Sequence, residues 1–319
     1  MDLNTWQISF NLSSLTFVDM FLPKDFGVEG SCVVLEGGGL RGVFTSGVLE
    51  YFLEKEIIFD RVIGVSAGAC LGASYISKQK GRNWKVNVEY PSDKRYMGLR
   101  HLFTSGSYFN MKFIFGEIPE KLVPFDEQAF FNNPAEFDIV VTSLSSGESV
   151  ILSKGDIGKI GVSKALVASS SIPLLSQPID IGGELFFDGG VSDSVPVRYA
   201  LNKHEKAVVI LTRPRGYRKG KTSSILLFKY VFRKQPEFLK ALLKRNEEYN
   251  KTLDFCDQME RDGKLFVIAP LPEFSVRRTE RSFEKRVNLY NHGYSQISKM
   301  YKDLQVFLNK SAVTDNTQE

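Results

Sequence analysis

Short runs of apolar, β-branched residues alternate along the first part of the chain with glycine-rich turns and longer amphipathic stretches. Two such runs, at residues 32–35 and 61–64, are each followed by a turn and then by a helix-type segment, at 43–55 and 67–77. A strand, a turn and a helix in repeated succession are typical of a parallel sheet with helices on both faces. The pattern therefore predicts an α/β fold on a doubly wound, mostly parallel sheet.

Residues 80–131 interrupt this rhythm. Aromatic side chains are scattered there among Gly, Pro and Asn without a helix or strand period, so we expect an excursion over one face of the sheet. The α/β pattern then resumes with a helix around 161–169 and with strands at 137–142, 149–152, 185–187 and 207–211.

The composition changes again after residue 212. A basic loop at 213–221 is followed by helices at 223–259 and 282–308 and by one further strand at 265–270. Because that strand returns the chain to the sheet, we expect this region to pack on the core instead of forming a separate domain.

The predicted organisation has three parts. They are an N-terminal segment at 1–30, a core at 31–212 and a mostly helical region at 213–319, whose polar tail from residue 311 is expected to be disordered.

Composition and charge exclude several classes of protein. The 319 residues are 43% hydrophobic and 24% charged, as in ordinary globular proteins, and the formal net charge of +4 is too small to indicate nucleic-acid binding. Cys32, Cys70 and Cys256 lack the spacing of a disulfide framework or a zinc site. We see no signal peptide or membrane span, and we expect a cytoplasmic protein without a metal or cofactor.

The pentapeptide Gly64-Val65-Ser66-Ala67-Gly68 lies between a predicted strand and a helix of small residues. G-x-S-x-G in this context is the pattern of a nucleophile elbow, a sharp turn that exposes the serine hydroxyl. The simpler interpretation is that Ser66 caps the following helix. The pentapeptide alone leaves both interpretations open.

A second glycine-rich turn follows the first predicted strand and opens a helix. It consists of Gly37, Gly38, Gly39, Leu40, Arg41 and Gly42. Its backbone N–H groups could converge on a negatively charged oxygen, helped by the helix dipole. The same residues fit the dinucleotide fingerprint G-x-G-x-x-G, but the acidic residue expected at the end of the second strand is replaced by the serine turn, although Asp60 precedes that strand.

A serine nucleophile needs a base. The chain has three histidines, His101, His204 and His292, and none follows a predicted strand in a glycine-rich turn. Asp188 ends an apolar strand and precedes Gly189 and Gly190, so we expect it at the carboxyl edge of the sheet, where Ser66 also emerges. A carboxylate there could accept the serine proton directly, although Asp-Gly is also a common turn sequence.

Together these three blocks resemble the patatin-like phospholipases, in which they occur in the same order. Residues 168–173 with Pro178 also resemble the family's segment before the aspartate, and the resemblance covers about residues 31–211. The stretch at 277–294 resembles a bacterial, cytosolic branch of the family. The resemblance implies a three-layer α/β/α sandwich with added C-terminal helices.

The resemblance also implies a Ser-Asp dyad, with Ser66 as nucleophile and Asp188 as general base, and ester hydrolysis through an acyl-enzyme. Residues 37–42 would form the oxyanion hole. Supporting glycines would be Gly64, Gly68, Gly189 and Gly190. Arg41 would help to hold the loop or attract a phosphate, or it would form a structural ion pair.

We therefore predict a serine lipid acyl hydrolase that cleaves esters of phospholipids or lysophospholipids. We expect a lipid as its partner, no nucleic acid, and a peripheral contact with a membrane through residues 84–131 or 213–251. Two alternatives remain, namely a Ser-His-Asp esterase with His204 or His292 as base, and a non-catalytic binder of lipid or nucleotide.

Overall fold

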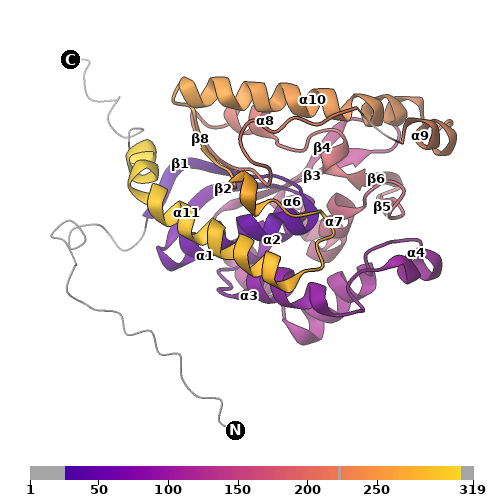
Figure 1. Ribbon diagram of the computed structural model, residues 1–319, viewed down its shortest axis with the longest axis horizontal. Helices are drawn as coiled ribbons and strands as arrows, with labels where there is room; N and C mark the ends of the chain where they lie inside the picture. Colours follow the sequence, from indigo (N-terminus) through magenta and orange to yellow (C-terminus); the bar gives the residue numbers. More distant parts are fainter. Residues whose placement is uncertain (1–25, 222–223, 310–319) are drawn as a thin grey trace, which may run out of the picture.

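The computed structural model describes residues 26–221 and 224–309 (Figure 1). Most of the predicted N-terminal segment and the predicted disordered tail from residue 311 lie outside the described residues. Within these residues, no helix is both long and apolar enough to cross a membrane.

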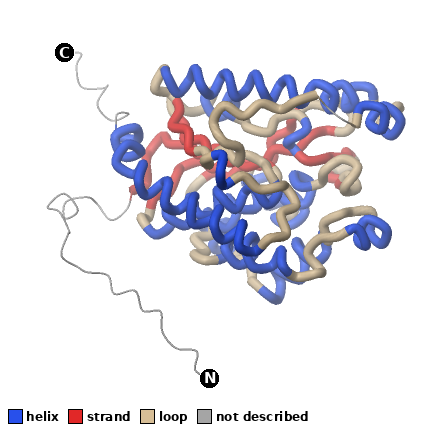
Figure 2. Tube along the Cα trace, viewed as in Figure 1, coloured by secondary structure: helices blue, strands red, loops and turns tan. Residues whose placement is uncertain are grey.

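An eight-stranded sheet, counted over the described residues, runs through the centre of the molecule (Figure 2). Its strands are β1 (Phe26–Leu35), β2 (Ile57–Val65), β3 (Glu136–Ser143), β4 (Ser149–Leu152), β5 (Ile179–Ile181), β6 (Glu184–Asp188), β7 (Ala207–Ile210) and β8 (Leu265–Ile268). The order is β5-β6-β3-β2-β1-β7-β8, with β4 paired to β3. Strands β3, β2, β1, β7 and β8 run parallel, which confirms the predicted mostly parallel sheet.

Helices cover both faces of this sheet (Figures 1 and 2). They are α1 (Val43–Glu54), α2 (Ala67–Ile76), α3 (Arg82–Trp84), α4 (Leu99–Ser105), α5 (Glu127–Asn132), α6 (Lys154–Ile160), α7 (Val162–Ser170), α8 (Val197–Leu201), α9 (Ile225–Val231), α10 (Pro236–Arg261) and α11 (Phe283–Asn309).

Alternate residues of the strands face opposite layers. Val33 and Leu35 of β1 belong to the core shared with α1, α2, α7 and α11, whereas Val34 belongs to the core shared with α8 and α10. This period of two is the geometry of an extended strand buried on both faces. The α/β class and the three-layer α/β/α sandwich with C-terminal helices are confirmed.

Two segments differ in detail from the expectation. The predicted helix at 223–259 is divided into α9 and α10, because Pro236 has no N–H to donate and restricts the backbone of Gln235. The excursion at 80–131 contains short helices and a π-helical segment at Phe113–Leu122. Buried side chains such as Tyr96, Met97 and Phe113 form a small core there, which reaches Leu40 in the glycine loop.

The long helix α11 packs along α1. The two helices approach closely at Gly47 and Gly293: a Cβ on Gly47 would clash with the carbonyl oxygen of Tyr290, and one on Gly293 with that of Phe44. The buried Arg286 of α11 also donates from Nε to the carbonyl of Val88 at 3.0 Å, which ties the helix to the excursion. The C-terminal helix is therefore part of the central fold.

We predict that Gly293→Ala lowers the free energy of unfolding by about 1–3 kcal/mol, because the added methyl group forces α11 away from α1. Urea denaturation of the purified protein measures this. Gly155→Ala is the matched control, since Gly155 lies exposed in α6 and a Cβ there meets no atom closer than 3.8 Å. Equal stability of the two variants would contradict the close packing described here.

Candidate active site

The candidate nucleophile and base meet because two strands arrive at one edge of β3 from opposite directions. Strand β2 runs parallel to β3 and ends with Val65 opposite Val140. Strand β6 runs antiparallel to β3 and ends with Asp188 opposite Val141. Strand β4 occupies the other edge of β3 at both positions, so β2 and β6 lie end to end on the same edge.

This arrangement corrects one detail of the sequence interpretation. Asp188 does not emerge at the carboxyl edge of a parallel sheet, because its strand runs the other way. It reaches Ser66 because the carboxyl ends of two opposed strands face each other across the junction.

Ser66 has the strained backbone of a nucleophile elbow. Its φ of 54° and ψ of −124° lie outside the regions that non-glycine residues ordinarily occupy, at a cost of about 1–3 kcal/mol. The flanking glycines allow the turn, since a Cβ on Gly64 would clash with Ala69 and one on Gly68 with the carbonyl of Leu35. No side-chain hydrogen bond caps α2, so the simple helix-cap role for Ser66 is not observed.

The hydroxyl of Ser66 donates to Oδ2 of Asp188 at 2.6 Å, and both residues are 7% exposed. The other carboxylate oxygen, Oδ1, accepts the N–H of Gly190 at 2.7 Å. Gly189 packs so closely on β3 that a Cβ there would clash with the carbonyl of Val140. The Asp188 carboxylate is thus held in one orientation by the turn that follows it.

The three histidines lie elsewhere. His101 contacts Arg100, with Nε2 3.4 Å from its Nε; His204 contacts the carbonyl of Gly30 through Nδ1 at 3.0 Å. Nε2 of His292 accepts the N–H of Leu271 at 3.0 Å, and its ring stacks on Phe274 with centroids 4.0 Å apart. No imidazole lies between Ser66 and Asp188, as a Ser-His-Asp arrangement would require.

Two backbone hydrogen bonds hold the glycine loop, one to the segment after β6 and one to the C-terminal region. The N–H of Leu40 donates to the carbonyl of Arg278 at 2.9 Å, and the N–H of Gly37 to that of Ser194 at 3.4 Å. Among the described residues, the N–H groups of Gly38 and Gly39 have no hydrogen-bond partner. Within the predicted set of 37–42, these two N–H groups thus have no competing acceptor in the described part of the chain, and both glycines line a cavity that Ser66 also lines.

Two supporting residues were not singled out from the sequence. The hydroxyl of Ser169 in α7 accepts the N–H of Ser66 at 2.8 Å and donates to the carbonyl of Val140 at 2.7 Å. Buried Glu36, which precedes the glycine loop, accepts the hydroxyl of Tyr249 at 2.8 Å and the N–H of Thr212. Only the position of Glu36 beside the glycines could have indicated it.

Arg41 and Asp60 are the residues that test two alternatives from the sequence, a structural ion pair at Arg41 and a dinucleotide-binding site. Arg41 is buried, its Nε has no partner, and it forms no ion pair within the described residues, so the structural ion pair is not found. Burial and the neighbouring Arg278 and Arg213 lower its pKa to about 10. Asp60 lies within β2 and accepts the N–H of Gly30 at 2.5 Å, away from the position of a ribose-binding carboxylate.

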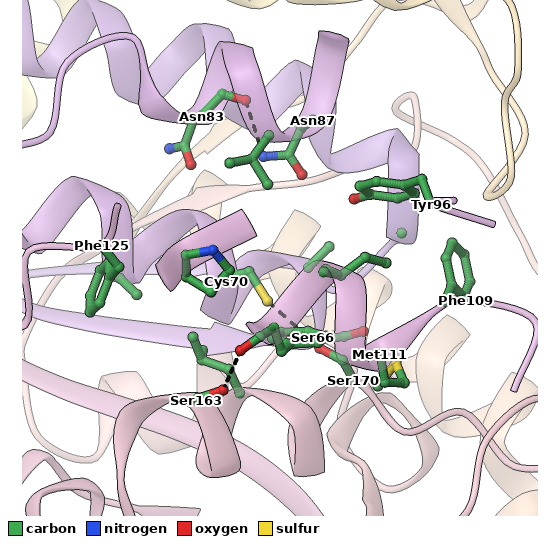
Figure 3. Close-up of a pocket in the computed structure, with 18 of the residues that line it drawn as sticks. Ser66, Cys70, Asn83, Asn87, Tyr96, Phe109, Met111, Phe125, Ser163 and Ser170 are labelled. Carbon is green, nitrogen blue, oxygen red and sulfur yellow. Dashed lines mark hydrogen bonds between the residues drawn. The ribbon is translucent and has the colours of Figure 1, made fainter. Parts of the chain in front are cut away.

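Two cavities meet at Ser66. The first, of about 140 Å³, has a mostly apolar lining that includes Phe109, Met111 and Phe125 (Figure 3). The second, of about 470 Å³, is lined by Asp188 and by cationic side chains. They share Gly39, Ser66 and Ile172, so a bound ester could extend in both directions from the serine.

Over the described ranges, no cluster of three His, Cys, Asp or Glu residues is placed to hold a metal ion.

Comparison with known families gives two matches. A family model described as patatin-like phospholipase matches residues 33–201, more than half of the 319 residues. A second, described as a domain of unknown function (DUF6363), matches residues 235–309.

Curated relatives include bacterial and eukaryotic proteins. The chain is 26% identical over 191 residues to the uncharacterized protein YjjU of Escherichia coli, covering 56% of this chain and 50% of that protein. It is 29% identical over 201 residues to the uncharacterized protein YqhO of Bacillus subtilis, covering 56% and 68% respectively. It is 24% identical over 210 residues to lysophospholipase NTE1 of Cryptococcus neoformans, covering 58% of this chain but 12% of that enzyme.

The match therefore spans half of the Escherichia coli protein and a small part of the fungal one. Among solved structures, VipD from Legionella pneumophila matches with a TM-score of 0.44 and 15% identity, covering 88% of this chain and 67% of that chain.

We predict that Ser169→Ala lowers the free energy of unfolding by about 1–3 kcal/mol, because it leaves the buried N–H of Ser66 without an acceptor. Urea denaturation measures the change. The control is Ser170→Ala, since the Ser170 hydroxyl has only a weak contact with Sγ of Cys70, at 3.7 Å. A loss in the control as large as in Ser169→Ala would argue against a specific role for the Ser169 hydroxyl.

Proposed function

The chain belongs to the patatin-like phospholipase family, and from that premise we propose that it is a serine lipid acyl hydrolase with a Ser66-Asp188 dyad. The observation that carries the proposal is the 2.6 Å hydrogen bond from the Ser66 hydroxyl to Asp188, at the wall between an apolar and a cationic cavity. The substrates we propose are phospholipids or lysophospholipids, in line with the name of the fungal relative, a lysophospholipase.

In the proposed first step, Asp188 accepts the proton of the Ser66 hydroxyl as the oxygen attacks the ester carbonyl carbon. The carbonyl oxygen becomes an oxyanion, and the free N–H groups of Gly38 and Gly39 would stabilise it. The intermediate collapses to an acyl-enzyme, and the leaving alcohol takes the proton from Asp188.

In the proposed second step, Asp188 takes a proton from water, which attacks the acyl-enzyme carbonyl. The second oxyanion collapses, the bond between the acyl carbon and the Ser66 oxygen breaks, and Asp188 returns its proton to Ser66 as the fatty acid leaves. The acyl chain would occupy the apolar cavity, whose lining offers few polar groups to compete with it. No metal or cofactor enters the proposed mechanism.

We predict that Ser66→Ala and Asp188→Asn each lower kcat/KM for lysophospholipid hydrolysis by about a thousandfold or more, because each removes one half of the proton-transfer pair. Fatty-acid release measures turnover, and a fluorophosphonate probe should label wild-type protein but not Ser66→Ala. Circular dichroism establishes that the variants are folded.

Asp180→Asn, at an exposed carboxylate of β5, is the matched control for Asp188→Asn, and His204→Ala and His292→Ala test the alternative base. Near-wild-type turnover of Asp188→Asn would refute the dyad. Loss of turnover in a histidine variant would favour the Ser-His-Asp esterase instead.

We also propose that the protein works in the cytoplasm and docks peripherally on a membrane. Exposed apolar side chains on α4 and α9 support this: Phe103 is 87% exposed, Leu226 83% and Tyr230 70%. Both helices lie toward the right-hand end of the molecule in Figure 1. Phe228 of α9 lines the cationic cavity, so a bilayer at α9 would lie close to an entrance to the site.

We predict that Leu226→Ser combined with Phe103→Ser weakens binding to anionic lipid vesicles about tenfold, because two side chains no longer bury apolar surface in the bilayer. Vesicle sedimentation at low salt measures binding. Val306→Ser is the control, since Val306 is 55% exposed and belongs to α11, whose C-terminal end lies at the left of Figure 1, away from α4 and α9. Equal binding by all three proteins would exclude this docking surface.

A further inference from the structure

The cationic cavity beside Ser66 is built jointly by the core and by residues beyond the patatin-like match. Gly38, Gly39 and Asp188 line it from the core. Arg245, on α10, and Arg278, after β8, line it from the region matched by the domain of unknown function. The region matched by the domain of unknown function therefore contributes two arginine side chains to a cavity beside Ser66.

Both arginines are fixed beside the reacting groups. Nε of Arg245 donates to the carbonyl of Gly190, in the turn that orients Asp188. The carbonyl of Arg278 accepts the N–H of Leu40 at 2.9 Å, and its side-chain stem packs so closely over the loop that a Cβ on Gly39 would lie 2.5 Å from its Cγ. One arginine thus adjoins the Asp188 turn, and the other the glycine loop.

The protein compensates the positive charge around this cavity only in part, through Glu36 and Asp188. Three more basic side chains, those of Arg41, Arg213 and Lys219, lie close behind its wall, and none of these five residues forms an ion pair with a carboxylate of the described residues. Glu36 lies among them, but its two oxygens accept hydrogen bonds from the neutral groups of Tyr249 and Thr212. Asp188, already bonded to Ser66, is the one carboxylate among the described lining residues.

Burial and mutual repulsion lower the pKa values of two of these groups. Burial and the nearby Arg245 and Arg278 lower the pKa of Lys219 to about 6, even though Glu36 opposes the shift. Burial and Arg278 also lower the pKa of Arg245. A bound anion would relieve this repulsion, since an opposite charge favours the charged form of each cation.

We infer that this cavity binds the phosphate of a lipid head group with net negative charge, and that Arg245 and Arg278 are the residues that determine this specificity. The inference rests on the proposed function, which places the ester at Ser66. The planar guanidinium binds the oxygens of phosphate or carboxylate groups in pairs, and phosphate is the anion that the head group of a phospholipid supplies.

The same surroundings disfavour a zwitterionic head group. A choline ammonium beside the phosphate would face cations, and protein sites for quaternary ammonium groups use several aromatic faces. Among the described lining residues, Phe228 is the one aromatic side chain. The expected substrates are therefore phosphate monoesters or anionic diesters of acylglycerol, with the acyl chain in the apolar cavity.

Binding to full-length Ser66→Ala protein tests the inference without turnover. We expect the Kd for lysophosphatidate to be at least about tenfold lower than for lysophosphatidylcholine with the same acyl chain, measured by calorimetry with monomeric lipid. Adding Arg278→Gln, which keeps the Cβ and Cγ that pack on Gly39, should abolish this preference, and Arg278→Lys should restore part of it. Arg261→Gln, exposed near the end of α10, is the matched control and should retain it.

Equal Kd values for the two lipids, or a preference that survives Arg278→Gln, would overturn the inference. A separate arm titrates inorganic phosphate: Arg278-dependent binding of phosphate without a preference between the lipids would mean that the cavity holds a free anion, which also overturns it. The wild-type protein is tested separately for hydrolysis of p-nitrophenyl butyrate, an ester without a head group, and this assay reports on the proposed function independently of the binding measurements. Lipid preference without hydrolysis would refute the hydrolase and leave the head-group site standing.

Discussion

Strand β3 offers one edge to two strands that approach it from opposite directions, and the geometry of the site depends on that junction. Val140 pairs with the last residue of β2, and Val141 pairs with Asp188, the last residue of β6. Adjacent residues of a strand are only about 3.3 Å apart along its axis, so the two chain ends cannot both continue in the sheet. The chain after Val65 must turn out at once, and Ser66 takes its strained backbone at that turn.

The buried polar groups near the site fall into two sets, one with hydrogen-bond partners in the protein and one without. The N–H of Ser66, both carboxylate oxygens of Asp188 and both of Glu36 have partners in the protein. In contrast, Nε of Arg41 and Nε of Arg213 are buried without one. Because an unpaired buried polar group costs about 1–3 kcal/mol, the first set fixes one arrangement of the dyad. The second set lies among the basic side chains around the cavity that we propose to bind a phosphate.

The sequence predicts the locally encoded parts of this architecture. Apolar runs indicate most strands, and G-x-S-x-G indicates the turn at Ser66, because both depend on neighbouring residues. The predicted strands do not include β5 and do not indicate the direction of β6, although the sequence carries a signal for both: Gly182 and Gly183, with φ of 66° and 90°, form the two-residue turn of a β-hairpin. The contact of Arg278 with Gly39 has no such signal, since tertiary packing alone brings these distant segments together.

The division between the two cavities bears on the order of events at the serine. Ser66 lines both cavities, but Asp188 is among the described residues of the cationic one and not of the apolar one. An acyl chain held in the apolar cavity would therefore leave the carboxylate facing the side from which the alcohol departs. Water entering the space vacated by the alcohol would reach the acyl-enzyme carbonyl beside the same carboxylate. Because one carboxylate faces that space in both steps, a dyad without histidine could serve acylation and deacylation with one base.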